Sequence, residues 1–261
     1  MPCIILICGT VASGKSTMTD MVIEHIEKKA NEKLDVIKFQ IDDLVVNDAI
    51  YKKRIDKLLK LSSNNEVTHE EYAKAFNDVK LRLGCKRMKE NVKKQPCSKF
   101  MIGKIQAAFG ESRNVAIEFN YSKLKELKKE LAGLPRNYKI IMAYALVDYD
   151  KLVVRNRMRT QKTMQRYLKN KEKNQAPRFA KLEKNKVRTV RNRLKRMASC
   201  FFGGNKELCD FLNVSNTSAS ASNLLLYSNN GAKMKLIYDS DEDTAVTKRE
   251  VYAKIDNNLV I

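Results

Sequence analysis

Residues 4–16 read Ile-Ile-Leu-Ile-Cys-Gly-Thr-Val-Ala-Ser-Gly-Lys-Ser, and this stretch decides the fold of the 261-residue chain. The apolar residues 4–8 are typical of a buried strand, and residues 9–16 match the pattern G-x-x-x-x-G-K-[ST]. Apolar residues then recur at helical spacing, at Met18, Met21, Val22 and Ile26. The sequence therefore predicts a strand, a glycine-rich loop and a helix in succession, which is the arrangement of a phosphate-binding P-loop.

The loop has the residues that a nucleoside triphosphate with Mg²⁺ requires. Gly9 and Gly14 allow backbone angles that turn the loop amides inward, as an anion nest at the positive end of the helix. Lys15 adds a charge that reaches the β- and γ-phosphates, and the Ser16 hydroxyl is placed to ligate Mg²⁺. We therefore expect ATP and Mg²⁺ as cofactors. The expected nucleotide-binding residues are Gly9, Ser13, Gly14, Lys15, Ser16 and Thr17.

The amino-acid composition argues against a zinc protein, a membrane protein and a secreted protein. The chain has six cysteines without a Cys-x-x-Cys pair and only two histidines, which argues against zinc and for reduced thiols inside the cell. No run of about eighteen apolar residues occurs, so neither a membrane span nor a membrane partner is expected. The first apolar run is too short for a signal peptide and has no basic region before it. We therefore expect a cytoplasmic protein.

The net charge of +21 is concentrated in one block. Residues 151–197 hold 18 lysines and arginines against two glutamates, a net charge of +16. Such a block repels itself unless it faces solvent or a polyanion. Three interpretations are open: a solvated helical face, a lid that clamps phosphates, and a surface that binds nucleic acid.

Strand-like runs alternate with helical patterns, which predicts a parallel sheet covered by helices on both faces. The last two runs are joined through Ser-Asn-Asn-Gly at residues 228–231, which is a hairpin turn signal. The acidic residues 239–243 that follow are expected to be exposed. After the first strand, the strand-like runs are residues 34–40, 115–119, 139–147, 224–227 and 233–238.

The expected fold class is α/β, with the P-loop NTPase fold: a central parallel sheet flanked by helices, a helical insertion and a C-terminal β-hairpin. One domain over residues 1–261 is expected. Residues 49–110 are charged and helical in pattern, and they predict the insertion between the second and third strands. Residues 149–202 predict a basic lid region of two helices, with a break near residues 174–177.

Two strands are expected to end in acids at the edge of the sheet where ligands bind. The run 34–40 is followed by Asp42 and Asp43. One of these could accept the proton of a substrate hydroxyl, and the other could cap the following helix. The third strand ends near Glu118, which could reach Mg²⁺ as a Walker B acid does, or hydrogen-bond an acceptor substrate. These acids predict a phosphoryl-transfer site at this edge.

Arginines follow the fourth strand in the basic block. Arg155, Arg157 and Arg159 are expected on one helix, and Arg178 comes after the break. Guanidinium groups stabilise the charge that spreads over the oxygens of a transferring phosphoryl group, and a closing lid excludes water. Of these residues, Arg159 and Arg178 are the strongest candidates for an active-site role.

Together these elements resemble the zeta toxin family and the related chloramphenicol phosphotransferases, which are P-loop kinases with a central parallel sheet. Asp42-Asp43-Leu44 is similar to the family's Asp-x-Phe/Leu element. Residues 226–233, Leu-Tyr-Ser-Asn-Asn-Gly-Ala-Lys, are similar to its Leu-Tyr-Asn-x-x-Gly hairpin. Arg178-Phe179 resembles the family's Arg-aromatic-Val-Pro segment, and Arg159 falls near its other phosphate-binding arginine.

The resemblance implies roles for single residues. Asp42 would be the general base, with Asp43 as the alternative. Residues 117–120, Ile-Glu-Phe-Asn, look like the family's Ile-Glu-Gly-Thr element, so Glu118 and Asn120 would contact the acceptor. The implied catalytic residues are Lys15, Asp42, Arg159 and Arg178, and the implied substrate-binding residues are Asp43, Glu118 and Asn120.

The resemblance also implies a function: transfer of the ATP γ-phosphate to a hydroxyl of a small-molecule acceptor, such as the nucleotide sugar UDP-N-acetylglucosamine. An antitoxin-like protein partner is implied as well. Two alternatives stay open. The basic block fits a kinase directed at RNA or polynucleotide ends, or an NTPase that binds nucleic acid. Phe119 and Ser122, where the family has Gly and Arg, fit a nucleotide-binding interaction protein with a degraded acceptor site.

Overall fold

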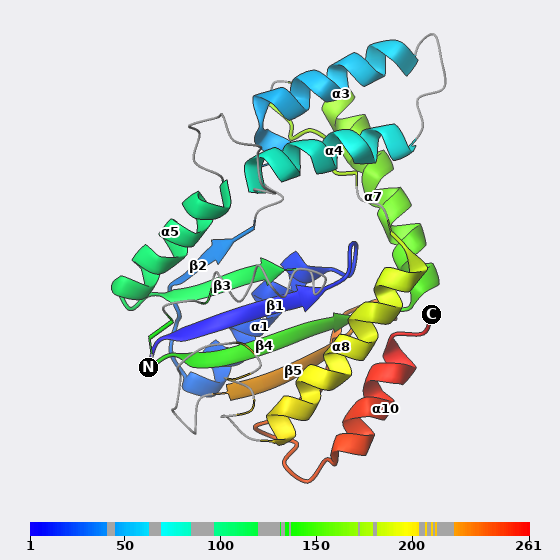
Figure 1. Ribbon diagram of the computed structural model, residues 1–261. Helices are drawn as coiled ribbons and strands as arrows, with labels where there is room; N and C mark the ends of the chain where they lie inside the picture. Colours follow the sequence, from blue (N-terminus) through cyan, green and yellow to red (C-terminus); the bar gives the residue numbers. More distant parts are fainter. Residues whose placement is uncertain are drawn as a thin grey trace. The chain divides into compact units, whose positions relative to one another are not determined.

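The computed structural model (Figure 1) shows an α/β chain that forms two compact units. Unit 1 comprises Met1–Phe39, Ile102–Leu152 and Glu183–Ile261, and unit 2 comprises Gln40–Met101 and Val153–Leu182. That the whole chain acts as one domain remains a prediction. The residues that the structure describes are 1–40, 45–62, 69–84, 97–119, 131, 134–135, 137–171, 173–179, 182–203, 207, 210, 212 and 222–261.

Unit 1 is built on a six-stranded sheet in the order β2-β3-β1-β4-β5-β6 (Figure 1). Strands β1 to β5 pair in parallel, and β6 pairs antiparallel with β5. The predicted α/β class, the P-loop NTPase fold and the C-terminal hairpin are confirmed. The strands are β1 (Cys3–Gly9), β2 (Val36–Phe39), β3 (Asn114–Phe119), β4 (Lys139–Leu146), β5 (Ser222–Ser228) and β6 (Lys235–Asp239).

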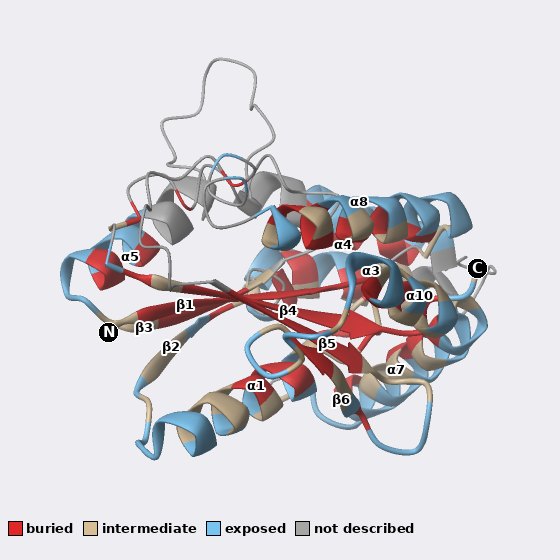
Figure 2. Cartoon of the chain, turned by 90° about the horizontal axis from the view of Figure 1, so that it is seen from below, coloured by how far each residue is buried: buried red, intermediate tan, exposed pale blue. Residues whose placement is uncertain are grey.

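Helices cover both faces of this sheet. α1 (Lys15–Ala30) lies on one face and α8 (Lys184–Phe202) on the other, with α10 (Lys248–Asn258) beside α8 (Figures 1 and 2). The β1 strand is buried along its whole length because strands flank it on both edges and helices cover its faces. Met18 and Val22 of α1 are fully buried in the core between helix and sheet. The continuous apolar sequence of β1 is what a strand buried on both faces needs.

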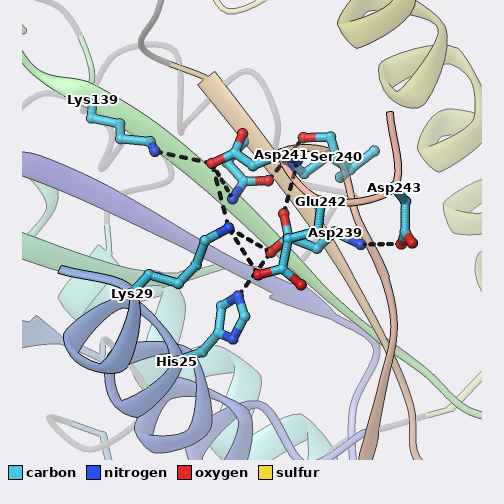
Figure 3. A network of polar contacts seen from close by, with 10 residues as sticks. His25, Lys29, Lys139, Asp239, Ser240, Asp241, Glu242 and Asp243 are labelled. Atoms are coloured by element: carbon cyan, nitrogen blue, oxygen red, sulfur yellow. Dashed lines mark hydrogen bonds and ion pairs between the residues drawn. The ribbon is translucent and has the colours of Figure 1, made fainter. Parts of the chain in front are cut away.

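A charge network holds the last turns of α1 against the end of β6 (Figure 3). Asp239 Oδ2 lies 2.8 Å from His25 Nε2 and 3.0 Å from Lys29 Nζ, and its side chain is 2% exposed. Lys29 Nζ also lies 3.2 Å from Glu242 Oε1. The ammonium group therefore lies between two carboxylates and offsets part of their charge. The backbone N–H of Asp241 donates to Asp239 Oδ1 at 2.9 Å.

This network corrects the expectation that residues 239–243 are all exposed, because Asp239 is buried. Burial by itself would raise the pKa of the Asp239 carboxyl. The hydrogen bonds from the Asp241 N–H, His25 and Lys29 outweigh burial and hold that pKa below its ordinary value. A buried carboxylate is tolerated here because every oxygen has a donor.

Unit 2 is helical and has its own core. It contains α3 (Ala49–Ser62), α4 (His69–Gly84) and most of α7 (Tyr149–Lys169). Tyr72 stacks on Phe179 with ring centroids 4.5 Å apart, and Tyr51 meets Phe76 edge-on at 5.4 Å. With α5 (Cys97–Gly110), which crosses the boundary of the units, α3 and α4 confirm the helical character of the predicted insertion wherever it is described.

The basic segment after β4 also follows the prediction. α7 ends at Lys169 and α8 begins at Lys184, so two helices flank the expected break. None of the helices in the described ranges combines the length and the hydropathy that a bilayer crossing needs.

Candidate functional site

In the sheet of unit 1, the carboxyl ends of the three adjacent strands β3, β1 and β4 lie side by side. β1 lies between β3 and β4, so the chain leaves β1 at the point where the strand order changes direction. Parallel sheets bind ligands in the crevice at such a point. In the register of the sheet, Glu118 of β3 lies beside Ile7 of β1, two residues before Gly9. The predicted acid is therefore level with the start of the P-loop.

The P-loop takes the conformation that its glycines permit. Gly14 has φ 90° and Ala12 has φ 63°, both in the left-handed region. The Ser13 N–H donates to Thr10 O at 3.3 Å, and the Met18 N–H donates to Gly14 O at 2.9 Å, which starts α1. A Cβ atom at Gly14 would lie 2.7 Å from Asn229 Nδ2, so a side chain there would displace Asn229 and also strain the left-handed backbone.

Two buried hydroxyl groups of the loop are evidence for an anion-binding site. Thr10 and Ser13 are 4% and 0% exposed, and their hydroxyl oxygens have no hydrogen-bond partner in the described part of the chain. Buried polar groups in folded proteins are nearly always paired. A phosphate group in the nest would supply acceptors for both. Ser16 and Thr17, at the first turn of α1, are exposed and therefore accessible to such a ligand.

The Lys15 side chain folds back over this loop. Its Nζ donates to Gly9 O at 3.3 Å and to Thr10 O at 3.0 Å. Both acceptors are neutral carbonyl groups. An anionic phosphate oxygen would bind the ammonium more strongly, because the attraction between opposite charges adds to the hydrogen bond.

Glu118 is aligned with the same helix. The Thr19 hydroxyl lies 3.3 Å from Glu118 Oε1 and 3.0 Å from Lys15 O, so it can donate its one proton to either. Thr19 follows Ser16 by three residues and therefore lies on the same face of α1. A carboxylate beside the helix that carries Ser16 suits Mg²⁺, which prefers oxygen ligands. Of the two roles that the sequence left open for Glu118, this geometry favours the Walker B role.

Asn229, at the end of β5, is a site residue that the sequence analysis missed. Its Nδ2 donates to Ser13 O at 3.0 Å, and its backbone N–H donates to Leu146 O at 2.9 Å. The side chain therefore holds the P-loop from the strand two places away in the sheet. The signal was present in the sequence: β5 is parallel to β1, so a polar residue after β5 reaches the same edge.

The next residue holds a different part of unit 1. Asn230 Oδ1 accepts from the Asp148 N–H at 2.8 Å, and its Nδ2 donates to Asp148 Oδ1 at 3.1 Å and to Asn258 O at 3.0 Å. Asn230 thus joins the end of β4 to the end of α10. The two neighbouring asparagines therefore hold different segments: Asn229 holds the P-loop, and Asn230 holds the ends of β4 and α10.

Replacing Asn229 by alanine is expected to weaken Mg·ATP binding about tenfold, because the bond that fixes Ser13 O is lost. The free energy of unfolding should change by only about 1 kcal/mol. Asn230→Ala is the matched control, since it should lower stability without a comparable loss of affinity. Calorimetric titration and urea denaturation measure both quantities. A larger loss of Mg·ATP affinity in Asn230→Ala than in Asn229→Ala would contradict the claim that Asn229 is the residue that supports the P-loop.

The predicted arginines lie in unit 2. Arg159 Nη2 donates to Asn156 Oδ1 at 3.1 Å, while Arg159 Nε and Arg155 Nη1 are buried without a partner in the described part of the chain. Burial lowers the pKa of Arg159, and it lowers the pKa of Arg178 to about 10. The backbone before Arg178 is fixed by the Tyr51 hydroxyl, which donates to Pro177 O at 2.5 Å. Arg159 and Arg178 are half-buried, and guanidinium groups partly removed from water suit an anionic ligand.

The structure brings some predicted residues together and leaves others untested. Unit 1 holds the P-loop residues with Glu118, and unit 2 holds Arg159 and Arg178. Asp42, Asp43, Asn120 and Ser122 lie outside the described residues, and their roles stay predictions.

Comparison with known proteins confirms the fold. No protein-family model matches the chain, and no curated protein matches its sequence. A solved structure from the PezAT chromosomal toxin-antitoxin system of Streptococcus pneumoniae is similar, with a TM-score of 0.51 and 13% identity over 98% of this chain and 77% of that chain. A candidate kinase from Chloroflexus aurantiacus has a TM-score of 0.34 and 13% identity, over 62% of this chain and 68% of that chain. The chain therefore shares its fold with the PezAT structure. The resemblance found in the sequence is thus confirmed at the level of fold.

Proposed function

We propose that the chain is an ATP-dependent phosphotransferase of zeta-toxin type, which transfers the γ-phosphate to a hydroxyl of a small-molecule acceptor. The observation that carries this proposal is the P-loop itself. The backbone of the P-loop is left-handed at Gly14. The buried hydroxyl groups of Thr10 and Ser13 have no hydrogen-bond partner in the described part of the chain. These features fit a phosphate ligand and have no evident structural purpose.

The nucleotide half of the site uses residues of unit 1. The loop amides and Lys15 would bind the phosphates, and Ser16 with Glu118 would hold Mg²⁺. The metal supplies positive charge that offsets the charge of the β- and γ-phosphate oxygens. Asn229 keeps the loop in place through Ser13 O.

The acceptor half rests on the residues that the family resemblance implies. Asp42 would accept the proton of the acceptor hydroxyl, and Asp43 and Asn120 would orient the acceptor. Arg159 and Arg178 would stabilise the charge of the transferring phosphoryl group. Their partial burial supports this role, because a guanidinium group partly removed from water gains more from an anion than a fully exposed one. We propose a nucleotide sugar such as UDP-N-acetylglucosamine as the acceptor.

We also propose an antitoxin-like protein partner and a cytoplasmic location. The similar structure comes from a toxin-antitoxin system, which supports such a partner. Cys3, Cys8 and Cys200 are buried as reduced thiols, which supports a location inside the cell.

Transfer of radiolabel tests the proposed function. Purified protein is incubated with Mg²⁺, γ-labelled ATP and either UDP-N-acetylglucosamine or a pooled metabolite extract. Label is expected in a small molecule, and Asp42→Asn should lower transfer by about 10³-fold while Asp43→Asn should lower it far less. Binding of ATP without transfer to any metabolite would contradict the proposal and favour the interaction protein with a degraded acceptor site.

Arg159→Gln is expected to lower kcat about 10²-fold and to change ATP affinity much less, because the guanidinium group acts on charge that develops during transfer. Arg157→Gln is the matched control: it removes the same charge two residues away on α7, from an exposed position. Steady-state kinetics of both variants measure the effect. Equal rates in the two variants would show that Arg159 has no role in transfer.

A further inference from the structure

α8 has two faces of opposite character. Its buried residues recur every three or four positions and pack toward the sheet, at Val187, Val190, Leu194, Met197, Ala198 and Cys200. The rest of the helix carries seven lysines and arginines and no acid. Figure 2 shows the outer side of α8 in the colour of exposed residues.

Acidic residues neutralise only part of this charge. Asp256 of α10 pairs with Lys195 at 2.5 Å and lies 3.8 Å from Arg191 Nε. Glu183, before the helix, pairs with Lys186 at 2.9 Å. Arg188 and Arg196 are exposed and have no carboxylate partner among the residues that the structure describes. The side of α8 away from α10 is therefore left positively charged.

The exposed side chains on this face are hydrogen-bond donors in a row. Arg188, Asn192 and Arg196 are spaced four residues apart and so span about 12 Å of the helix. Arg193 is exposed beside them, and so is Thr189, whose hydroxyl donates its proton to Asn185 O at 3.0 Å. Arginine and asparagine are residue types that contact phosphate oxygens in nucleic-acid complexes.

Among the described residues, the stretch of α8 from Arg188 to Arg196 has no exposed apolar or aromatic side chain, which other kinds of partner need. Protein interfaces have an apolar centre, but the apolar residues in this part of α8 are buried. Single-stranded nucleic acid binds through bases that stack on aromatic rings. The nearby Tyr252 of α10 is already covered, since Lys195 Nζ and Lys248 Nζ lie 5.7 and 5.8 Å from the centre of its ring.

We propose that this face of α8, formed by Arg188, Asn192, Arg193 and Arg196, binds the phosphate backbone of double-stranded nucleic acid without reading its sequence. The contacts are electrostatic, so binding should release counterions and weaken as salt rises. This interaction lies outside the nucleotide site and does not depend on phosphoryl transfer.

Fluorescence anisotropy with labelled 20-base-pair duplex RNA and DNA, at about 50 to 300 mM KCl, tests the proposal. The wild-type protein should bind with a plot of log K against log salt whose slope is about −3 or steeper. The triple variant Arg188→Gln, Arg193→Gln, Arg196→Gln should bind at least about tenfold more weakly, with a slope reduced by about 3.

The matched control removes the same charge from exposed positions of α3, as Lys53→Gln, Lys57→Gln, Lys60→Gln. It should retain affinity within about threefold, because general attraction to a basic protein is a weaker effect than direct contact. Circular dichroism checks that both variants fold. Equal losses in the two variants, no duplex binding at 50 mM KCl, tighter binding of single-stranded RNA, or displacement of the duplex by polyglutamate at equal charge would each overturn the proposal.

Discussion

Replacing Lys15 by methionine is expected to lower kcat/KM for phosphoryl transfer by about 10³-fold. Methionine keeps the length and apolar stem of lysine but removes the ammonium group, whose bonds to Gly9 O and Thr10 O show that it reaches across the loop. Without that charge, the β- and γ-phosphates lose their only mobile cation from the P-loop sequence. Steady-state kinetics of label transfer measure the loss.

The matched control is Lys28→Met, on the same helix. Lys28 pairs with Glu24 at 2.7 Å, and both side chains are mostly exposed, so its loss should leave kcat/KM within about twofold. A loss below tenfold in Lys15→Met, or an equal loss in the control, would contradict the role given to the loop. Thermal melting checks that neither variant unfolds.

Replacing Asp239 by asparagine is expected to lower the free energy of unfolding by about 3 kcal/mol at pH 7. The change replaces the charged hydrogen bonds to Lys29 and His25 by those of a neutral buried amide, and it leaves Lys29 with only the more exposed carboxylates of Asp241 and Glu242. Urea denaturation measures the loss. Glu24→Gln is the control, because it breaks an exposed pair with Lys28 on the same helix and should cost less than about 0.5 kcal/mol.

The same carboxylate makes stability depend on pH. The pKa of Asp239 is lower in the folded chain than in the unfolded chain. Its contribution is therefore fully present above the unfolded pKa of about 3.9 and is lost as pH falls through the folded pKa. Between pH 5 and pH 3, the wild type should lose more stability than Asp239→Asn does. Parallel acid dependence of the two proteins would contradict this account.

The P-loop and the sheet could be predicted from sequence because they depend on local patterns. An apolar run, two glycines and a helical repeat specify strand, loop and helix without reference to the rest of the chain. The hairpin was also predicted, although its strands are Ser222–Ser228 and Lys235–Asp239 rather than 224–227 and 233–238. Asn229 and Asn230 use their side chains to hold the turn, and strand pairing resumes only at Lys235.

The contacts that could not be predicted from the sequence join residues that are far apart along the chain. Asn229 contacts a residue 216 positions earlier, and Asp239 contacts His25 from 214 positions away. Periodicity shows that a residue is near a strand end, but not which neighbour faces it. Asp239 was therefore placed on the surface with its acidic neighbours, whereas His25 and Lys29 make its burial favourable.

The central claim is that the loop at Gly9–Ser16 binds Mg·ATP, and a calorimetric titration of ATP into the protein tests it most directly. The account predicts one site per chain, with affinity that falls at least tenfold when Mg²⁺ is chelated and at least tenfold in Lys15→Met. ATP binding that is equal in wild type and Lys15→Met, or no binding at millimolar ATP, would contradict it.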